Sequence, residues 1–269
     1  ESDGRIGRIT LNRPEAMNAI NHELPGDLAE AVRQANDDAR VHVIVLSGKG
    51  AAFCAGYDLL KYAQTDGSNT FTQSMLWDPM KDYKAMMRNN DCFMSLWRSY
   101  KPVLCKVHGY AVAGGSDIAL CSDLIFMAED ARIGYMPTRV WGCPTTAMWV
   151  YRLGAEQAKR MLLTGDLIDG REAKAIGLVL DAVPLDRLDA RIDELLGRVA
   201  SMPKNQLMMQ KLMINQALDN MGLRTTQLIA NLFDGISRHT PEGVALTARC
   251  EAVVFNEAVR ERDSGMPLG

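Results

Sequence analysis

The sequence predicts an α/β fold that continues into a helical C-terminal region. A strand, an amphipathic helix and a buried strand follow one another near the start of the chain, an order typical of α/β architecture. After Pro203 the apolar spacing is almost wholly helical to the end of the chain. We therefore expect an α/β core over residues 1–200 and a helical region over residues 201–269.

The first three elements are each indicated by a local pattern. Residues 8–11 form a short strand that Asn12-Arg13-Pro14 ends, because proline cannot donate to a strand ladder. Residues 41–48 are a nearly continuous β-branched run, typical of a strand that is buried on both faces. Between them lies a helix whose apolar face comprises Leu24, Leu28, Val32 and Ala35.

The rest of the core alternates in the same way. We expect further strands at 101–107, 123–128, 131–134 and 177–179. We expect helices at 116–121, 155–163, 171–176 and 188–199, and a loop at 108–115. The polar, methionine-rich residues 66–95 receive no assignment.

Composition excludes several classes of protein. With 269 residues and 47% hydrophobic residues, the chain can bury a sizeable core without disulfide or metal staples. A net charge of -3 offers no electrostatic basis for binding nucleic acid. The apolar runs are far shorter than the ~20 residues that span a bilayer, so no membrane partner is expected. The 6 cysteines are dispersed without metal-ligand spacing, which favours reduced thiols in a cytoplasmic protein.

Two loops carry the chemical signal. One is Phe53-Cys54-Ala55-Gly56-Tyr57-Asp58, which follows the strand at 41–48, and the other is Ala113-Gly114-Gly115-Ser116-Asp117 at a helix start. Glycines allow a close approach of the backbone, and N–H groups at a helix start point toward negative charge. One N–H from each loop could bind a polarised carbonyl oxygen, and such a donor contributes about 3–4 kcal/mol to transition-state binding. Asp117, in the first turn of the helix, is placed to move a proton on the same substrate.

Simpler interpretations exist, and other catalytic templates fail. A Gly-Gly pair before a helix is often only a tight connection, and an early acidic residue often only complements the helix dipole. The segment 47–53 begins like a dinucleotide-binding loop, but Phe53 occupies the third glycine position. Ser116 lacks the G-x-S-x-G context of a hydrolase nucleophile, and the chain has no phosphate-binding G-x-x-x-x-G-K-[ST] loop.

The two loops and their flanking segments resemble the crotonase (enoyl-CoA hydratase/isomerase) superfamily. The matching segments occur in the family's order from about residue 6 to residue 183, which makes the resemblance highly specific for the superfamily. They are residues 11–20, 52–59, 101–103, 109–117, 163–166 and 173–179.

The resemblance implies a spiral of ββα units whose C-terminal helices pack homotrimers, often paired into hexamers. It implies an acyl-CoA thioester substrate whose carbonyl is bound by the N–H groups of Tyr57 and Gly114, with Asp117 as the catalytic carboxylate. No metal or separate cofactor is implied, because coenzyme A is part of the substrate. The implied substrate-binding residues are Ala16, Met17, Ala55, Tyr57, Asp58, Leu59, Leu60, Gly114 and Gly115.

The chain departs from the family pattern at one catalytic position. Family hydratases generally use two glutamates, and Asp117 stands at the first of them. At the second, on a segment that is one residue longer than usual, the chain has Thr138 or Arg139. Arg139 could hold a substrate carboxylate, pair with Asp117 or simply lie on the surface. Other candidates for a second catalytic carboxylate are Asp78, Asp82 and Asp91. A group of large apolar residues could line a pocket for the acyl chain or simply belong to the core: Trp77, Met80, Tyr83, Met86 and Met87.

Three functions follow from these observations. The first is an enoyl-CoA hydratase that adds water through a thioester enolate. The second is an enoyl-CoA isomerase or another crotonase-type enzyme, because isomerisation needs only one carboxylate to shuttle a proton. The third, from a different class, is a CoA-thioester-binding protein with degraded catalysis.

Overall fold

A computed structural model describes residues 2–58, 73, 76–139, 142–253, 257–258, 260–261 and 264. Its centre is a six-stranded sheet in the order β1-β2-β3-β4-β6-β9, in which only β1 is antiparallel to its neighbour. The strands are β1 (Ser2–Asp3), β2 (Ile6–Leu11), β3 (Val43–Gly48), β4 (Val103–Val107), β6 (Leu124–Ala128) and β9 (Asp181–Val183). The β-branched run at 43–46 is fully buried, as expected for a central parallel strand.

A second, three-stranded sheet gives the fold its spiral character. It has the order β5-β7-β8, with β5 (Tyr110–Val112), β7 (Arg132–Gly134) and β8 (Leu167–Asp169). The chain passes from β4 in the large sheet to β5 in the small one and then into α5 (Gly114–Leu120). It repeats this step from β6 to β7, so the ββα units predicted for the fold are confirmed.

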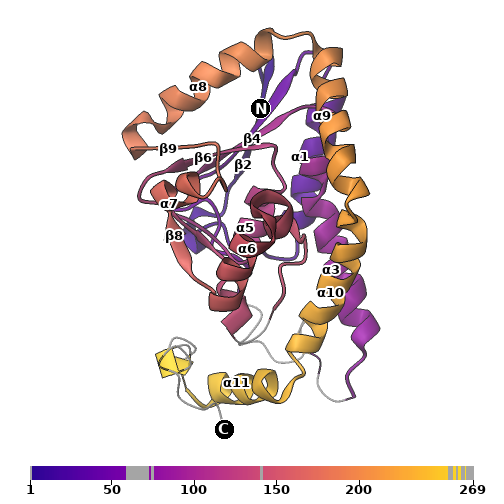
Figure 1. Ribbon diagram of the computed structural model, residues 1–269, viewed down its shortest axis with the longest axis vertical. Coiled ribbons are helices and arrows are strands. Elements are labelled where there is room, and N and C mark those ends of the chain that lie inside the picture. Colours follow the sequence, from indigo (N-terminus) through magenta and orange to yellow (C-terminus); the bar gives the residue numbers. More distant parts are fainter. Residues whose placement is uncertain are drawn as a thin grey trace.

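Helices cover the sheets and build the C-terminal region (Figure 1). Helix α1 (Leu24–Asp37) buries the predicted residues Leu24, Leu28 and Val32. Among the described residues, the core also contains α3 (Pro79–Phe93), α4 (Ser95–Arg98), α6 (Met148–Thr164), α7 (Gly170–Ala175) and the short 3-10 helices η1 (Pro14–Ala16) and η2 (Met136–Arg139). The C-terminal part includes α8 (Leu185–Ser201), α9 (Lys204–Asn220), α10 (Leu223–Ser237) and α11 (Pro241–Ala252).

Several expected elements differ from those observed. The predicted loop at 108–115 contains strand β5, because its short apolar stretch pairs in parallel with β7. Residues 177–179 form no strand, and β9 begins at Asp181 instead. Helix α6 begins seven residues before the predicted start at 155 and bends at Gly154, whose φ of 73° interrupts its helical backbone.

The C-terminal helices pack on the core. Helix α8 lies over β6 and β9, and α10 runs beside α3 along one long side of the molecule (Figure 1). Helix α9 is fastened to the core by Lys211, whose buried ammonium contacts Asp123 at 2.8 Å. Within the ranges described above, no helix is long and apolar enough to cross a membrane.

Candidate active site

Residues 13–20 form a platform beneath the first loop. The side chain of Asn18 accepts a hydrogen bond from the Arg13 N–H and donates to the carbonyls of Lys49 and Ala52, at 2.8 to 2.9 Å. Asn18 adopts a left-handed φ of 55°, a conformation that asparagine tolerates better than most residues. These three bonds hold the platform against the segment that leads into the loop.

The platform is joined directly to the predicted substrate-binding residues. The Ala55 N–H donates to the Met17 carbonyl at 3.0 Å, and Asp58 N–H donates to Ile20 at 3.0 Å. Asp58 also forms an ion pair with Arg13 at 3.1 Å. The structure therefore brings together Ala16, Met17, Ala55, Tyr57 and Asp58, whereas Leu59 and Leu60 lie outside the described residues.

Cys54 connects the two loops. Its N–H donates to the Tyr110 carbonyl at 2.9 Å, and its own carbonyl accepts from the Val112 N–H at 3.1 Å. Burial raises the pKa of the Cys54 thiol to about 12, so the thiol stays protonated at neutral pH. Its contribution to the site is the backbone pairing that places one loop against the other.

The turn into α5 places the Gly114 N–H beside the first loop. Ala113 has a φ of 52°, and this strained conformation directs the chain from β5 into the helix. The Gly114 and Gly115 amides, in the first turn of α5, have no acceptor within the helix. A Cβ placed on Gly56 would lie 3.6 Å from the Gly114 nitrogen, and a Cβ on Gly114 would lie 2.9 Å from the Tyr57 ring. The two predicted donor segments thus meet at one place.

Replacing Gly115 by alanine is expected to destabilise the protein. The new methyl group would overlap the carbonyl oxygen of Cys54, a backbone atom that is held in the pairing between the loops. Overpacking of this kind costs about 1–3 kcal/mol, or more where the backbone must move. Urea unfolding of Gly115→Ala should show this loss, with Gly26→Ala as the control, because a Cβ there meets nothing within 4 Å. Equal stability of the two variants would contradict the expected overlap.

Asp117 lies in the first turn of α5 and is only 2% exposed. Its Oδ1 accepts a hydrogen bond from the Thr146 hydroxyl at 2.7 Å. The pKa of Asp117 is raised to about 8: burial is the main cause, the negative charge of Asp234 adds to it, and the hydrogen bond from Thr146 opposes it. A carboxyl group with a pKa near the working pH is suited to proton transfer.

Thr138 and Arg139 lie in η2 and turn toward the end of α6. The Thr138 hydroxyl donates to the Leu162 carbonyl at 2.6 Å, and Arg139 Nε donates to the Thr164 carbonyl at 3.1 Å. Thr138 and Arg139 both pack around Gly165. This packing offers no replacement for the second family glutamate and favours the surface interpretation of Arg139.

The other acidic candidates have distinct structural roles. Asp78 caps the start of α3 through the Met80 N–H, and exposed Asp91 pairs with Arg98 and Arg224. Asp82 is fully buried and accepts a 2.7 Å hydrogen bond from Trp77. Met86 and Met87 are buried in α3, which is compatible both with the wall of an acyl pocket and with a plain core position.

Three residues of the site were missed by sequence reasoning: Thr146, Tyr135 and Asp234. Tyr135 is buried, and this burial, followed by the charges of Asp117 and Asp234, raises its pKa well above the usual value. Asp234 lies on α10 and accepts a hydrogen bond from the Cys143 N–H at 3.2 Å. One sequence signal for Asp234 existed: Gln227, Asn231 and Asp234 repeat at helical spacing in an otherwise apolar segment.

Together, a two-sheet α/β spiral, two converging backbone loops and one buried carboxyl group define an enzyme of the crotonase type. A family model described as enoyl-CoA hydratase/isomerase matches residues 1–246. The chain therefore belongs to the enoyl-CoA hydratase/isomerase family, which confirms the resemblance found in its motifs.

Individual relatives agree with this assignment. The crystal structure of an enoyl-CoA hydratase from Mycobacterium smegmatis is 48% identical, with a TM-score of 0.91 over 99% of this chain and 92% of that one. An enoyl-CoA hydratase/isomerase from Xanthobacter autotrophicus Py2 is 27% identical, with a TM-score of 0.86 over 99% and 97% of the two chains. A putative enoyl-CoA hydratase from Thermus thermophilus is 31% identical over 242 residues, which are 88% of this chain and 90% of the relative.

Proposed function

We propose that this enzyme is an enoyl-CoA hydratase that adds water across the double bond of a 2-enoyl-CoA. The observation that carries the proposal is the meeting of the segment 56–57 with Gly114, at the start of the helix that carries Asp117. The two N–H groups polarise the thioester carbonyl and stabilise the enolate that forms when water attacks the β-carbon. No cofactor is required beyond the coenzyme A of the substrate.

Asp117 moves the proton in this mechanism. Its ionised form takes a proton from water as the oxygen bonds to the β-carbon, and the electron pair of the double bond shifts into the thioester enolate. The protonated Asp117 then returns the proton to the α-carbon, which completes the addition of one water and restores the carboxylate. Because the pKa of Asp117 is about 8, we expect kcat/KM to rise with pH through that value.

Isomerisation is the second candidate. It is favoured because Thr138 and Arg139, which stand where family hydratases have their second glutamate, bond to the end of α6 and supply no second carboxylate. A single carboxylate that takes a proton at one carbon and returns it at another would suffice for it. Incubation with crotonyl-CoA, longer 2-enoyl-CoAs and 3-enoyl-CoAs, followed by chromatographic separation and mass analysis, tests the two candidates. Gain of one water supports the hydratase, and conversion of 3-enoyl- to 2-enoyl-CoA without water addition supports the isomerase. Tight binding of these thioesters without turnover would overturn both.

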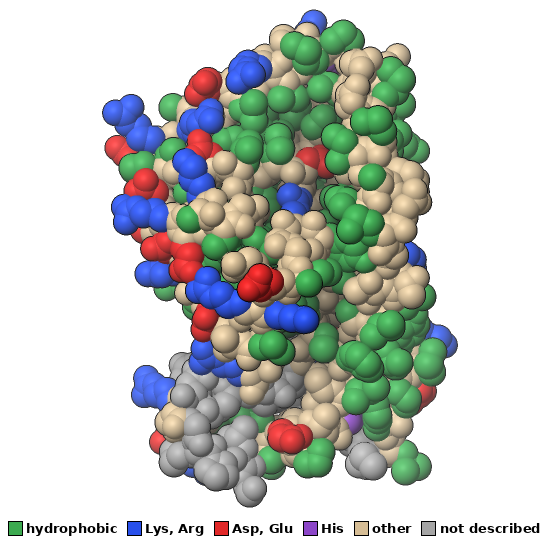
Figure 2. All heavy atoms as spheres, in the orientation of Figure 1, with side chains coloured by type: hydrophobic (Ala, Val, Ile, Leu, Met, Phe, Trp, Pro, Cys, Tyr) green, Lys and Arg blue, Asp and Glu red, His purple; other side chains and the backbone are tan. Residues whose placement is uncertain are grey.

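We further propose a homotrimer or a pair of trimers. Helix α10 is inverted: its buried face is polar, and it exposes Leu228, Ile229, Leu232, Phe233 and Ile236. Helix α9 exposes Met209, Leu212, Met213 and Ile214, and hydrophobic side chains gather on this side of the molecule (Figure 2). Apolar surfaces of this kind mark protein–protein contacts.

Light scattering tests the assembly. The expected mass is three or six times the 29.7 kDa of the chain, and Phe233→Asp should reduce it. A wild-type protein that stays monomeric at micromolar concentration would contradict the proposal.

We also propose a cytoplasmic location. All six cysteines are free, which supports a reducing compartment.

A further inference from the structure

The buried face of α10 carries a polar stripe, which we define as Gln227, Asn231 and Asp234. All three side chains are buried, and Asp234 is 4% exposed. Their spacing of four and three residues places them on one face of the helix. Polar groups are seldom turned inward unless they have specific partners there, so the stripe indicates a role for α10 inside the molecule.

The polar stripe holds the segment 143–146. Gln227 donates to the Thr146 carbonyl at 3.1 Å, and Asn231 donates to the Thr145 carbonyl at 3.1 Å. Asp234 completes the set by accepting from the Cys143 N–H at 3.2 Å. Thr146 in turn donates a hydrogen bond from its hydroxyl to Asp117. The C-terminal helix therefore supports the hydrogen-bond partner of the catalytic carboxyl group.

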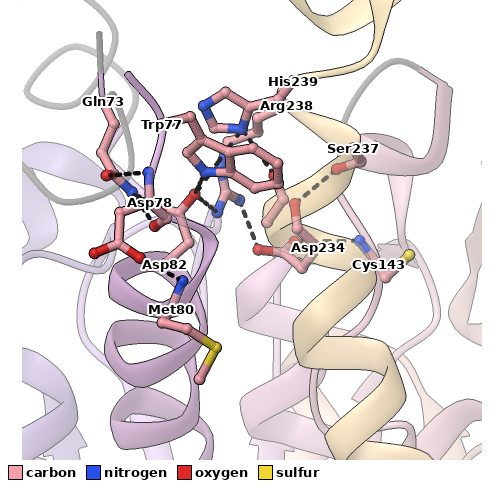
Figure 3. Close-up of polar contacts among 11 residues, drawn as sticks. Gln73, Trp77, Asp78, Met80, Asp82, Cys143, Asp234, Ser237, Arg238 and His239 are labelled. Carbon is pink, nitrogen blue, oxygen red and sulfur yellow. Dashed lines mark hydrogen bonds and ion pairs between the residues drawn. The ribbon is translucent and has the colours of Figure 1, made fainter. Parts of the chain in front are cut away.

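Asp234 is held in place by an ion pair. Arg238, one turn further along α10, contacts it at 2.6 Å and lies between Asp234 and Asp82 of α3 (Figure 3). Trp77 covers this cluster by stacking on His239, with ring centroids 4.1 Å apart. The cluster fixes the position of Asp234.

Tyr135 lies close to Asp234. Its hydroxyl and Asp234 Oδ1 both lie within 3.4 Å of the point where a Gly142 Cβ would stand. The charges of both carboxylates reach Tyr135, and that of Asp234 also reaches Asp117. Among the described residues, the titratable groups that interact with Asp117 include Cys121 at the end of α5, Tyr135 after β7 and Asp234 on α10.

We propose that Asp234 is the second carboxylate of this active site, a positioning residue that acts on Asp117 from the C-terminal helix. The inference rests on the proposed function, in which the ionised form of Asp117 accepts a proton from water. A negative charge near Asp117 delays its ionisation as the pH rises and makes the carboxylate a stronger base once formed. In addition, the polar stripe holds Thr146 in position to bond with Asp117.

Asp234→Asn tests the electrostatic effect, because asparagine can still accept from the Cys143 N–H but carries no charge. We expect the acid limb of the pH profile of kcat/KM to move to lower pH by about 0.5 to 1 unit, because the pKa of Asp117 falls when a neighbouring negative charge is removed. Asp234→Glu, which keeps the charge, should leave the limb near its wild-type position. Should Asp234→Asn fail to fold, Asp234→Ser replaces it as a smaller neutral acceptor.

Two controls separate this role from a structural one. Asp82→Asn removes a carboxylate of α3 that faces the same arginine, and we expect the limb to stay in place. Gln227→Leu breaks one bond of the polar stripe without a change of charge, and should lower stability without moving the limb. A shift of equal size in either control would overturn the proposal.

A titration without substrate keeps the inference distinct from the proposed function. Aspartate labelled with ¹³C at the carboxyl group allows the midpoint of Asp117 to be followed by NMR, with Asp117→Asn used for assignment. Asp234→Asn should lower this midpoint whether or not the protein hydrates any enoyl-CoA. Absence of turnover in the wild type would overturn the proposed function, whereas an unchanged midpoint in Asp234→Asn would overturn this inference.

Discussion

Asp117→Asn is expected to lower kcat/KM for enoyl-CoA hydration by about 10²- to 10⁴-fold, the range typical of a lost general acid–base group. The amide is nearly isosteric and can still accept the 2.7 Å hydrogen bond from Thr146, so the site should keep its shape. It cannot take a proton from water, however. Substrate binding should persist, because the proposed carbonyl donors are backbone groups that the substitution leaves unchanged.

Steady-state kinetics with crotonyl-CoA, together with calorimetric binding of a saturated acyl-CoA, separates the chemical step from binding. Asp91→Asn serves as the control, since this exposed carboxylate pairs with Arg98 and Arg224 at the surface. A variant Asp117→Asn that retains activity within a few fold of the wild type would remove Asp117 from the mechanism. Loss of binding in place of turnover would assign it to substrate recognition.

The loops of the site could be predicted because their information is local. The glycines at 56, 114 and 115 and the buried strand that precedes the first loop are readable from short stretches of sequence. Asp117 follows directly from its place in the first turn of α5. Strand β5 was missed because its three residues gain their structure from pairing with β7 and with Cys54, both distant in sequence. Such short strands carry too little periodicity to be distinguished from a loop.

The second half of the site depends on contacts between distant residues. Asp234 lies more than a hundred residues beyond Asp117, in a region for which the family resemblance implied only subunit packing. The polar stripe is visible in the sequence, but its partners are backbone carbonyls and an N–H of the segment 143–146, which have no sequence signature. Under the two proposals above, the C-terminal region has two faces with different functions, one toward the active site and one toward other subunits.

The same substitution, Asp117→Asn, should stabilise the folded protein, and more so as the pH rises. The carboxyl group has a pKa of about 8 when folded and about 3.9 in an unfolded chain. Between these values the folded state keeps a proton that the unfolded state has lost, so the free energy of unfolding of the wild type falls as the pH rises from 4 to 8. Asparagine does not titrate, and the variant should escape this loss.

The expected gain at pH 8 is roughly 3 to 5 kcal/mol, with little difference between the two proteins near pH 4. Thermal unfolding of both proteins at pH 5, 6.5 and 8, at equal protein concentration, measures how the difference changes. Asp117→Ala provides the matched comparison, because it also removes the charge but leaves the Thr146 hydroxyl without its acceptor. A stability difference that does not change with pH would mean that Asp117 is ionised in the folded state at neutral pH. A difference that grows with pH would show that the protein sacrifices stability to keep a buried carboxyl group ready for proton transfer.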